Sequence, residues 1–245
     1  MWAQRAADYR KSGVRIDENI AYGQSPREKY DLIWPDSVPV GLAVFVHGGY
    51  WMRLSKSDWS DLAEGARSRG WAVCLPSYTL APEVRIAQIT RQITQAITHA
   101  AAKVPGPIRL SGHSAGGHLV SRMISDTSPL SPSILKRIEH TLSISGLHDL
   151  RPLLRTEMNE TLHLDLVEAT AESPVLLMPQ ENAKLTCWVG GGELPEFIRQ
   201  AHVMAQIWEG LGANTAFNSD GSHNHFTVVE ALKDPNSPLT ACFVG

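Results

Sequence analysis

Short apolar runs alternate along the chain with segments in which apolar residues recur at every third or fourth position. The runs predict buried strands, and the three-to-four spacing predicts helices that pack one face on a core. The clearest helix covers 86–100, with isoleucines at positions 86, 89, 93 and 97. The predicted strands are 29–34, 42–46, 71–75, 108–111, 142–145, 185–189 and 215–218, and the predicted helices are 59–68, 86–100, 115–125, 197–211 and 226–232.

This alternation predicts an α/β protein with a mostly parallel central sheet and helices on both faces, because parallel strands need crossover connections. Ligands of such sheets bind beyond the carboxyl ends of the strands. Two segments lack the alternation: 1–25, expected to be an arm or cap, and 156–179, expected to be an insertion or partial lid. We find no internal repeat and expect one domain over 1–245, a length that a large α/β domain can have.

Composition and charge exclude several classes of protein. Apolar residues make up 43% of the chain, which is too apolar for disorder. The 22 basic and 25 acidic residues give a net charge of −3, so no bulk field attracts nucleic acid or a membrane surface. The longest apolar runs are too short to span a bilayer, and the first residues lack the apolar core of a signal peptide. Three scattered cysteines predict no disulfide framework, and we expect a cytoplasmic protein.

The strongest chemical motif is the G-x-S-x-G run at 112–116, which follows a predicted strand and opens a predicted helix. A nucleophilic serine needs such a tight strand-to-helix turn, and flanking glycines allow it because they carry no Cβ. The helix N-terminus behind Ser114 supplies N–H groups for developing negative charge. An ordinary serine in a glycine-rich turn is the alternative, and the strand-turn-helix context favours the nucleophile.

A second motif, HGGYW at 47–51, directly follows a buried strand. Its HGG run resembles the oxyanion loop of lipases and esterases. By that analogy Gly48, Gly49 and Tyr50 form the loop, and the N–H groups of Gly49 and Tyr50, with that of Ala115, face the reacting carbonyl. For an HGG run alone, a tight turn without a catalytic role is the alternative.

The base of such a serine is expected near the C-terminal end, because triads of this fold run in the order serine, acid, histidine. The histidines beyond His202 are His223 and His225, and one of them is expected to take the Ser114 proton. His47 is expected to support its loop rather than act as the base. The 223/225 pair is an alternative metal site, but no partner completes a ligand motif, so we expect no metal and no cofactor.

The acid of the triad is expected after the strand 185–189, and the first carboxylate there is Glu193. Its role is to hold the imidazole tautomer and to stabilise the imidazolium. Glu196 is the first alternative, and Asp149 and Asp220 are weaker ones.

The expected substrate pocket is aromatic. Trp51 and Tyr78, with Tyr50, are predicted to line it near the serine, and His113 adjoins the nucleophile. Packing in the core is the alternative role for these rings. We expect a small-molecule substrate and leave a homodimer open.

These segments together resemble the arylformamidases, or kynurenine formamidases, of the α/β-hydrolase fold. The resemblance spans most of the chain and rests first on HGGYW at 47–51 and GHSAGGHL at 112–119. Most esterases of the fold show HGGG or HGGA instead, so the HGG-x-W form is fairly specific. The resemblance also includes Tyr22-Gly23 followed by Asp31-Leu32, the segment 78–82, and Pro195-Glu196-Phe197.

The resemblance implies that Ser114 is the nucleophile, that His225 is the base, from a His-Phe pair before the last helix, and that Glu193 is the acid. The family usually has Asp at the acid position, but a Glu serves elsewhere in the fold. The implied reaction is hydrolysis of N-formyl-L-kynurenine to formate and L-kynurenine, in tryptophan breakdown. A carboxylesterase for short-acyl or aromatic esters is the alternative, because the same site serves both. A binding protein with the hydrolase fold but no catalytic activity is a remote third alternative.

Overall fold

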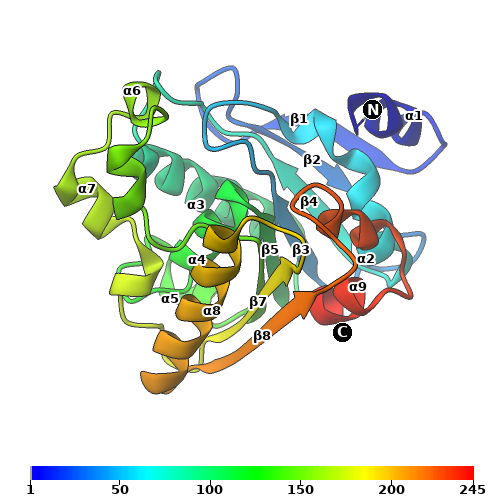
Figure 1. The fold of residues 1–245 in the computed structure, drawn as a ribbon. Coiled ribbons are helices and arrows are strands. Elements are labelled where there is room, and N and C mark those ends of the chain that lie inside the picture. Colours follow the sequence, from blue (N-terminus) through cyan, green and yellow to red (C-terminus); the bar gives the residue numbers. More distant parts are fainter. Residues whose placement is uncertain (1) are drawn as a thin grey trace.

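The computed structural model describes residues 2–245, through which one mixed sheet runs (Figure 1). The strand order is β1-β2-β4-β3-β5-β6-β7-β8. The pairs β1–β2 and β2–β4 are antiparallel, and the other neighbouring pairs are parallel. The strands are β1 (Ile16–Ala21), β2 (Lys29–Ile33), β3 (Leu42–Val46), β4 (Ala72–Pro76), β5 (Ile108–His113), β6 (Ile138–Ile144), β7 (Lys184–Gly190) and β8 (Asn214–Asp220).

Helices cover both faces of this sheet, which confirms the predicted architecture (Figure 1). One face carries α3, α4 and α8, and the other carries α2 and α9. The α-helices are α1 (Trp2–Arg10), α2 (Glu64–Ser68), α3 (Ile86–Lys103), α4 (Ala115–Arg122), α5 (Pro132–Leu135), α6 (Asn159–Leu162), α7 (Leu166–Ala171), α8 (Pro195–Gly210) and α9 (Pro238–Val244). The 3-10 helices are η1 (Lys56–Asp58), η2 (Ser60–Ala63), η3 (Arg151–Arg155), η4 (Pro174–Leu176) and η5 (Val228–Lys233).

Strand β3 explains why its sequence is a continuous apolar run. Leu42, Val44 and Val46 belong to the hydrophobic core on one side of the sheet, and Ala43 and Phe45 belong to the core on the other. A parallel strand covered on both faces has no solvent side on which polar residues could alternate. The neighbouring central strands are also parallel, so their carboxyl ends lie at the same edge of the sheet.

Two of the predicted helices and the last helix differ from the prediction. The predicted helix 59–68 is the 3-10 helix η2 followed by α2, and the predicted helix 226–232 is the 3-10 helix η5. The last helix is instead α9, which the apolar spacing did not reveal. Its local signal is a cap: Ser237 Oγ accepts a hydrogen bond from Thr240 N at 3.0 Å, and Pro238 occupies the first turn.

The N-terminal segment, expected to be an irregular arm or cap, contains α1 and the edge strand β1. Strand β1 gave no apolar alternation because only Ile16 and Ile20 are half-buried in it, together with exposed neighbours. Helix α1 packs on η1 and η2. It is held by Arg5, which bonds Glu230 at 2.6 Å, and by Tyr9, whose hydroxyl bonds Glu64 at 2.6 Å.

The segment 156–179 forms α6, α7 and η4 against η3, α4 and α8. Leu162, Ala169 and Val175 are buried there, whereas Leu166 and Val167 are exposed. Short helices with a loop between each explain the missing periodicity. Among the described residues, the cavity that holds Ser114 is lined by other segments, so the structure does not show 156–179 as a lid.

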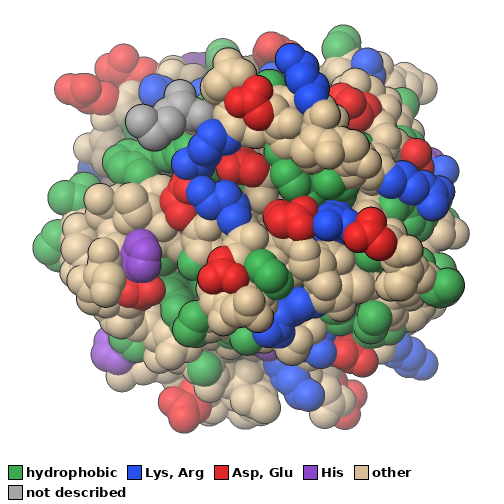
Figure 2. All heavy atoms as spheres, turned by 90° about the vertical axis from the view of Figure 1, so that its right-hand side faces the viewer, with side chains coloured by type: hydrophobic (Ala, Val, Ile, Leu, Met, Phe, Trp, Pro, Cys, Tyr) green, Lys and Arg blue, Asp and Glu red, His purple; other side chains and the backbone are tan. Residues whose placement is uncertain are grey.

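Acidic and basic side chains are interspersed over the face that carries α1, as expected for a nearly balanced charge (Figure 2). Among residues 2–245, no helix is both long and apolar enough to cross a membrane.

Candidate active site

Ser114 lies on a strained turn between β5 and α4. Its backbone has φ 56° and ψ −117°, a conformation that costs a non-glycine residue free energy and that clusters at functional sites. The flanking glycines make the turn feasible: a Cβ on Gly112 would lie 2.2 Å from Gly116 O, and a Cβ on Gly116 would lie 1.9 Å from Val46 O. A hydrogen bond of 2.8 Å from Ser114 N to Ile144 O ties the turn to β6.

The HGG loop lies against this turn, as its place after the neighbouring strand β3 requires. A Cβ on Gly48 would be 3.0 Å from Ser114 Cβ. Gly49 has φ 102°, and a Cβ there would lie 2.3 Å from Arg53 O. Within residues 2–245, no hydrogen-bond acceptor is bonded to the backbone N–H of Gly49, Tyr50 or Ala115. N–H groups left free beside a serine can stabilise an oxyanion.

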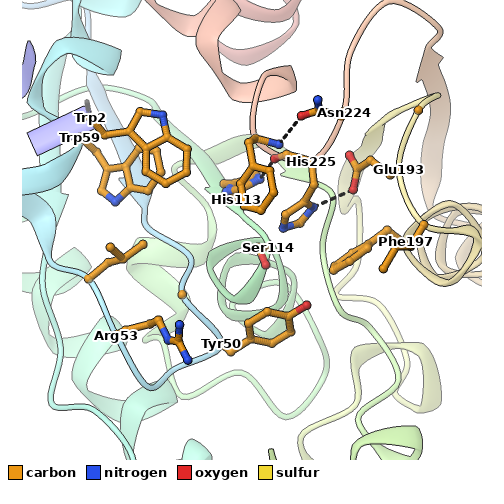
Figure 3. A pocket seen from close by; sticks show the side chains of 15 residues that line it. Trp2, Tyr50, Arg53, Trp59, His113, Ser114, Glu193, Phe197, Asn224 and His225 are labelled. Carbon is orange, nitrogen blue, oxygen red and sulfur yellow. Dashed lines mark hydrogen bonds and ion pairs between the residues drawn. The ribbon is translucent and has the colours of Figure 1, made fainter.

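Glu193 and His225 form a directed pair in the same site (Figure 3). His225 Nδ1 and Glu193 Oε2 are 2.7 Å apart. The other carboxylate oxygen, Oε1, accepts from Ser145 Oγ at 2.5 Å and from Gly190 N at 2.8 Å. The Glu193 side chain is fully buried, and these three bonds replace the water it loses.

The other carboxylates considered for this role are committed elsewhere. Glu196 pairs with Arg199 at 2.7 Å, and that guanidinium lowers the pKa of the Glu196 carboxyl. Asp149 pairs in the same way with Arg151. Asp220 lies 3.0 Å from His223 Nδ1, so the alternative histidine has its own acid outside the cavity.

His113 supports the loop that carries His225. Burial lowers its pKa from the usual value to about 3, so the imidazole is neutral at neutral pH. Its Nε2 lies 2.9 Å from the carbonyl oxygen of His225, and a neutral ring that donates there keeps Nδ1 as the acceptor. The two rings are 4.7 Å apart. His113 also lines the cavity, as predicted from its place beside the serine.

Trp51 and Tyr78 do not line the cavity within the described residues, contrary to the prediction. Both side chains are completely buried in the core. Tyr78 stacks on His47 at 4.4 Å and donates its hydroxyl to His47 O at 3.1 Å. Trp51 packs edge-on against His118. Tyr78 therefore packs behind the HGG loop and Trp51 in the core, so both rings have the packing role that was the alternative.

The cavity around Ser114 has a volume of about 650 Å³ and is mostly apolar (Figure 3). Residues from the N-terminal helix, the HGG loop, the end of β7 and the loop before η5 meet there. The lining residues are Trp2, Gly49, Tyr50, Arg53, Leu54, Trp59, His113, Ser114, Gly192, Glu193, Leu194, Phe197, Asn224, His225 and Phe226.

Several lining residues were not predicted from the sequence. The rings of Trp2 and Trp59 lie 4.7 Å apart, tilted by 36°, and Phe226 lies 5.9 Å from Trp2. Phe197 lies 4.1 Å from the His225 ring. Only Phe226 carried a signal in the sequence, because it follows the expected base directly. Trp2 and Trp59 meet only through the folding of α1 onto η2.

The histidine pair considered as a metal site has no third ligand in place. Among residues 2–245, no group of three or more His, Cys, Asp or Glu side chains is arranged to hold a metal ion.

Known proteins match the chain in sequence and in fold. Residues 43–184 match the model of a family described as the alpha/beta hydrolase fold. A kynurenine formamidase of Danio rerio is 30% identical, over 91% of this chain and 78% of its own length. A crystal structure from Silicibacter sp. TM1040, provisionally assigned as a thioesterase, is 50% identical with a TM-score of 0.94, over 100% of this chain and 91% of that one. A phosphonate-inhibited esterase B from Lactobacillus rhamnosis is 16% identical with a TM-score of 0.74, over 99% of this chain and 89% of that one, and so shows a likeness of fold alone.

Proposed function

The chain belongs to the α/β-hydrolase family and is a hydrolase, and we propose that it is a serine hydrolase that cleaves N-formyl-L-kynurenine to formate and L-kynurenine. The observation that carries the mechanism is the 2.7 Å bond between Glu193 and His225 in the cavity that holds Ser114. The substrate is supported by the likeness to kynurenine formamidases over nine-tenths of the chain.

The proposed roles follow from the hydrogen bonds of Glu193. Ser145 and Gly190 occupy Oε1, so Oε2 is the oxygen that accepts from His225. A carboxylate can only accept, so His225 carries its proton on Nδ1 and leaves Nε2 free as the base. The bond also stabilises the imidazolium when the proton of Ser114 arrives.

The reaction has two halves. Ser114 Oγ attacks the formyl carbon while His225 Nε2 takes its proton, and the N–H groups of Gly49, Tyr50 and Ala115 stabilise the oxyanion. The tetrahedral intermediate collapses when His225 returns the proton to the leaving amine, which departs as kynurenine. Water then attacks the formyl ester of Ser114, again with His225 as the base, and formate leaves.

The lining of the cavity agrees with an aromatic leaving group. Trp2, Trp59 and Phe226 form one wall, and Phe197 lies on the other side of His225. Such rings bind an aromatic amine by burial and edge or face contacts.

Ester or thioester hydrolysis is the second candidate function. The specific observation in its favour is the half-identical Silicibacter structure, which is described as a thioesterase. The same nucleophile, base and oxyanion donors would act on either acyl bond.

The test is kcat/KM for N-formyl-L-kynurenine beside p-nitrophenyl acetate and an acetyl thioester, with Ser114→Ala as the control. We expect the formamide to be preferred and the variant to lose all three activities. Turnover of ester or thioester with negligible formamide hydrolysis would keep the mechanism and discard the substrate. Full activity of Ser114→Ala would discard the mechanism.

A further inference from the structure

Arg53 lines the active-site cavity and has an exposed side chain. Within residues 2–245, no carboxylate is paired with its guanidinium, whereas Arg5, Arg85 and Arg199 all form ion pairs. A guanidinium is always charged and presents a planar fork of donors that matches a carboxylate. An unpaired one on the wall of an apolar cavity is therefore available to a ligand.

The backbone places Arg53 on the same turn as the proposed oxyanion donors. Gly49 O accepts hydrogen bonds from Met52 N at 3.0 Å and from Arg53 N at 3.1 Å. The turn is pinned from behind by Arg27, whose guanidinium donates to Leu54 O and Tyr78 O. An anion held by Arg53 is thereby kept in a fixed relation to the serine. Figure 3 shows Arg53 and Tyr50 on the side of Ser114 away from His225.

The charge available to a ligand in this cavity is positive. The lining carboxylate, Glu193, is fully buried and bonded to His225, Ser145 and Gly190, so it neither pairs with Arg53 nor faces solvent. Most of the remaining lining side chains are aromatic or aliphatic. The site therefore combines an apolar wall with one cation.

We propose that Arg53 is a specificity-determining residue that binds a carboxylate on the leaving group, so that the enzyme prefers aromatic substrates whose leaving group carries a carboxylate. The inference deepens the proposed function and rests on it for the position of the charge. A formyl group has a single carbon, so the carboxylate of such a substrate must lie on the leaving amine.

The experiment compares two esters that differ in one charge, 4-acetoxybenzoate and its methyl ester, in the wild type and in Arg53→Gln. The readout is the ratio of kcat/KM for the acid to kcat/KM for the methyl ester, which cancels the chemistry of the acetyl group. We expect this ratio to fall about tenfold in Arg53→Gln, the effect of one lost hydrogen-bonded charge partner in a partly exposed site. The loss should appear in KM, because the contact exists before the reaction as well as during it.

Two controls make the result specific. Arg91→Gln removes another exposed arginine, on α3, and should leave the ratio unchanged. Arg53→Lys keeps the charge without the fork and should restore part of the ratio. In the wild type the ratio should also decline as NaCl is raised, because salt screens an exposed charge.

A ratio that changes less than twofold in Arg53→Gln overturns the inference, and so does an equal fall for both esters, which would show a structural role in the turn. The outcome is separable from the proposed function. If Arg53→Gln lowers the acid-to-methyl-ester ratio but the wild type does not hydrolyse N-formyl-L-kynurenine, the role of Arg53 stands and the proposed substrate is wrong. Hydrolysis of the formamide with an unchanged ester ratio would do the reverse.

Discussion

The cavity has a floor and a rim that are built in different ways. We define the floor as the Gly48–Gly49 loop, Glu193, His225 and the turn 112–116 that carries Ser114, and the rim as Trp2, Arg53, Leu194 and Phe226. The floor is covered and hydrogen-bonded: Ser114 is 2% exposed and Glu193 8% exposed. On the rim, Leu194 is 70% exposed and Phe226 59% exposed.

We expect the floor to affect the rate of the reaction and the rim to affect which substrate is preferred. The floor glycines lie so close to neighbouring atoms that a Cβ would clash, and Glu193 is held by three hydrogen bonds. Rim side chains come from separate segments, and those of Arg53, Leu194 and Phe226 are exposed, so exchanging a rim side chain should leave the Ser114 turn in place. Changes in the floor should therefore act on kcat or on folding, and changes in the rim on substrate preference.

The largest effect is expected from Glu193→Gln in the floor. Gly190 N–H and Ser145 Oγ–H donate to Oε1, so the amide oxygen takes that position and its NH₂ group faces His225. The histidine is then driven to the wrong tautomer, and kcat should fall about 10⁴-fold, as for a buried triad acid. Steady-state kinetics measure this, and circular dichroism checks folding.

The matched control is Glu196→Gln, which alters a half-exposed carboxylate paired with Arg199. It should keep kcat. If kcat fell strongly in Glu196→Gln while Glu193→Gln stayed active, Glu196 and not Glu193 would be the acid of the triad.

The second test adds one methyl group to the floor. In Gly116→Ala the new Cβ would lie 1.9 Å from Val46 O, so β3 and the turn must separate. We expect a loss of about 3 kcal/mol or more in the free energy of unfolding, measured with urea. Gly210→Ala, where nothing lies within 4 Å of the new Cβ, should be neutral or slightly stabilising. Equal stability of the two variants would contradict a close-packed floor.

The third test uses pH, because the floor is surrounded by buried histidines. Burial lowers the pKa of His118 from 6.5 to about 3 and that of His47 to about 4. Between these values and 6.5 the unfolded chain binds more protons, so stability falls as pH decreases through this window. Each such histidine should remove about 2 kcal/mol between pH 7 and pH 5.

Urea unfolding at pH 7, 6 and 5 measures this slope in the wild type and in His118→Gln. The variant should show a shallower slope, whereas His202→Gln, which removes an exposed imidazole on α8, controls for the substitution itself. A slope that His118→Gln leaves unchanged would argue against a neutral buried ring.

The smallest effect is expected on the rim. Trp2→Ala removes a ring that packs 4.7 Å from the Trp59 ring and should lower kcat/KM for 1-naphthyl acetate about fivefold relative to ethyl acetate. Trp2→Phe should retain most of the preference. Trp34→Ala, which truncates an indole bonded to Asp17 at the sheet edge, is the control. If Trp2→Ala slowed both esters equally, Trp2 would belong to the floor.

Much of the floor could be predicted because its signals are local. The turn at Ser114 needs glycine on either side, and the HGG loop needs small residues against that turn, so both appear as motifs next to apolar strands. Glu193 could be proposed because it is the first carboxylate after β7. The choice between His223 and His225 came from a family resemblance, and in the structure it is His225 that lies beside Glu193.

The rim and the roles of the other aromatic residues could not be predicted in this way. Trp51 belongs to the motif after β3 and Tyr78 follows β4, but both side chains enter the core. Trp2 belongs to a segment that looked irregular, and its contact with Trp59 exists only because α1 docks on η2.

The order of residues therefore predicted the α/β architecture and brought the serine turn, the HGG loop, Glu193 and two candidate histidines forward as one candidate site. The spacing of apolar residues and the need for glycine in a tight turn depend on residues that are close in the chain, so both can be recognised in the sequence. Only the folded chain shows which rings and which arginine line the cavity. These contacts depend on how side chains from segments far apart in the sequence pack together, and local sequence patterns carry no information about that packing.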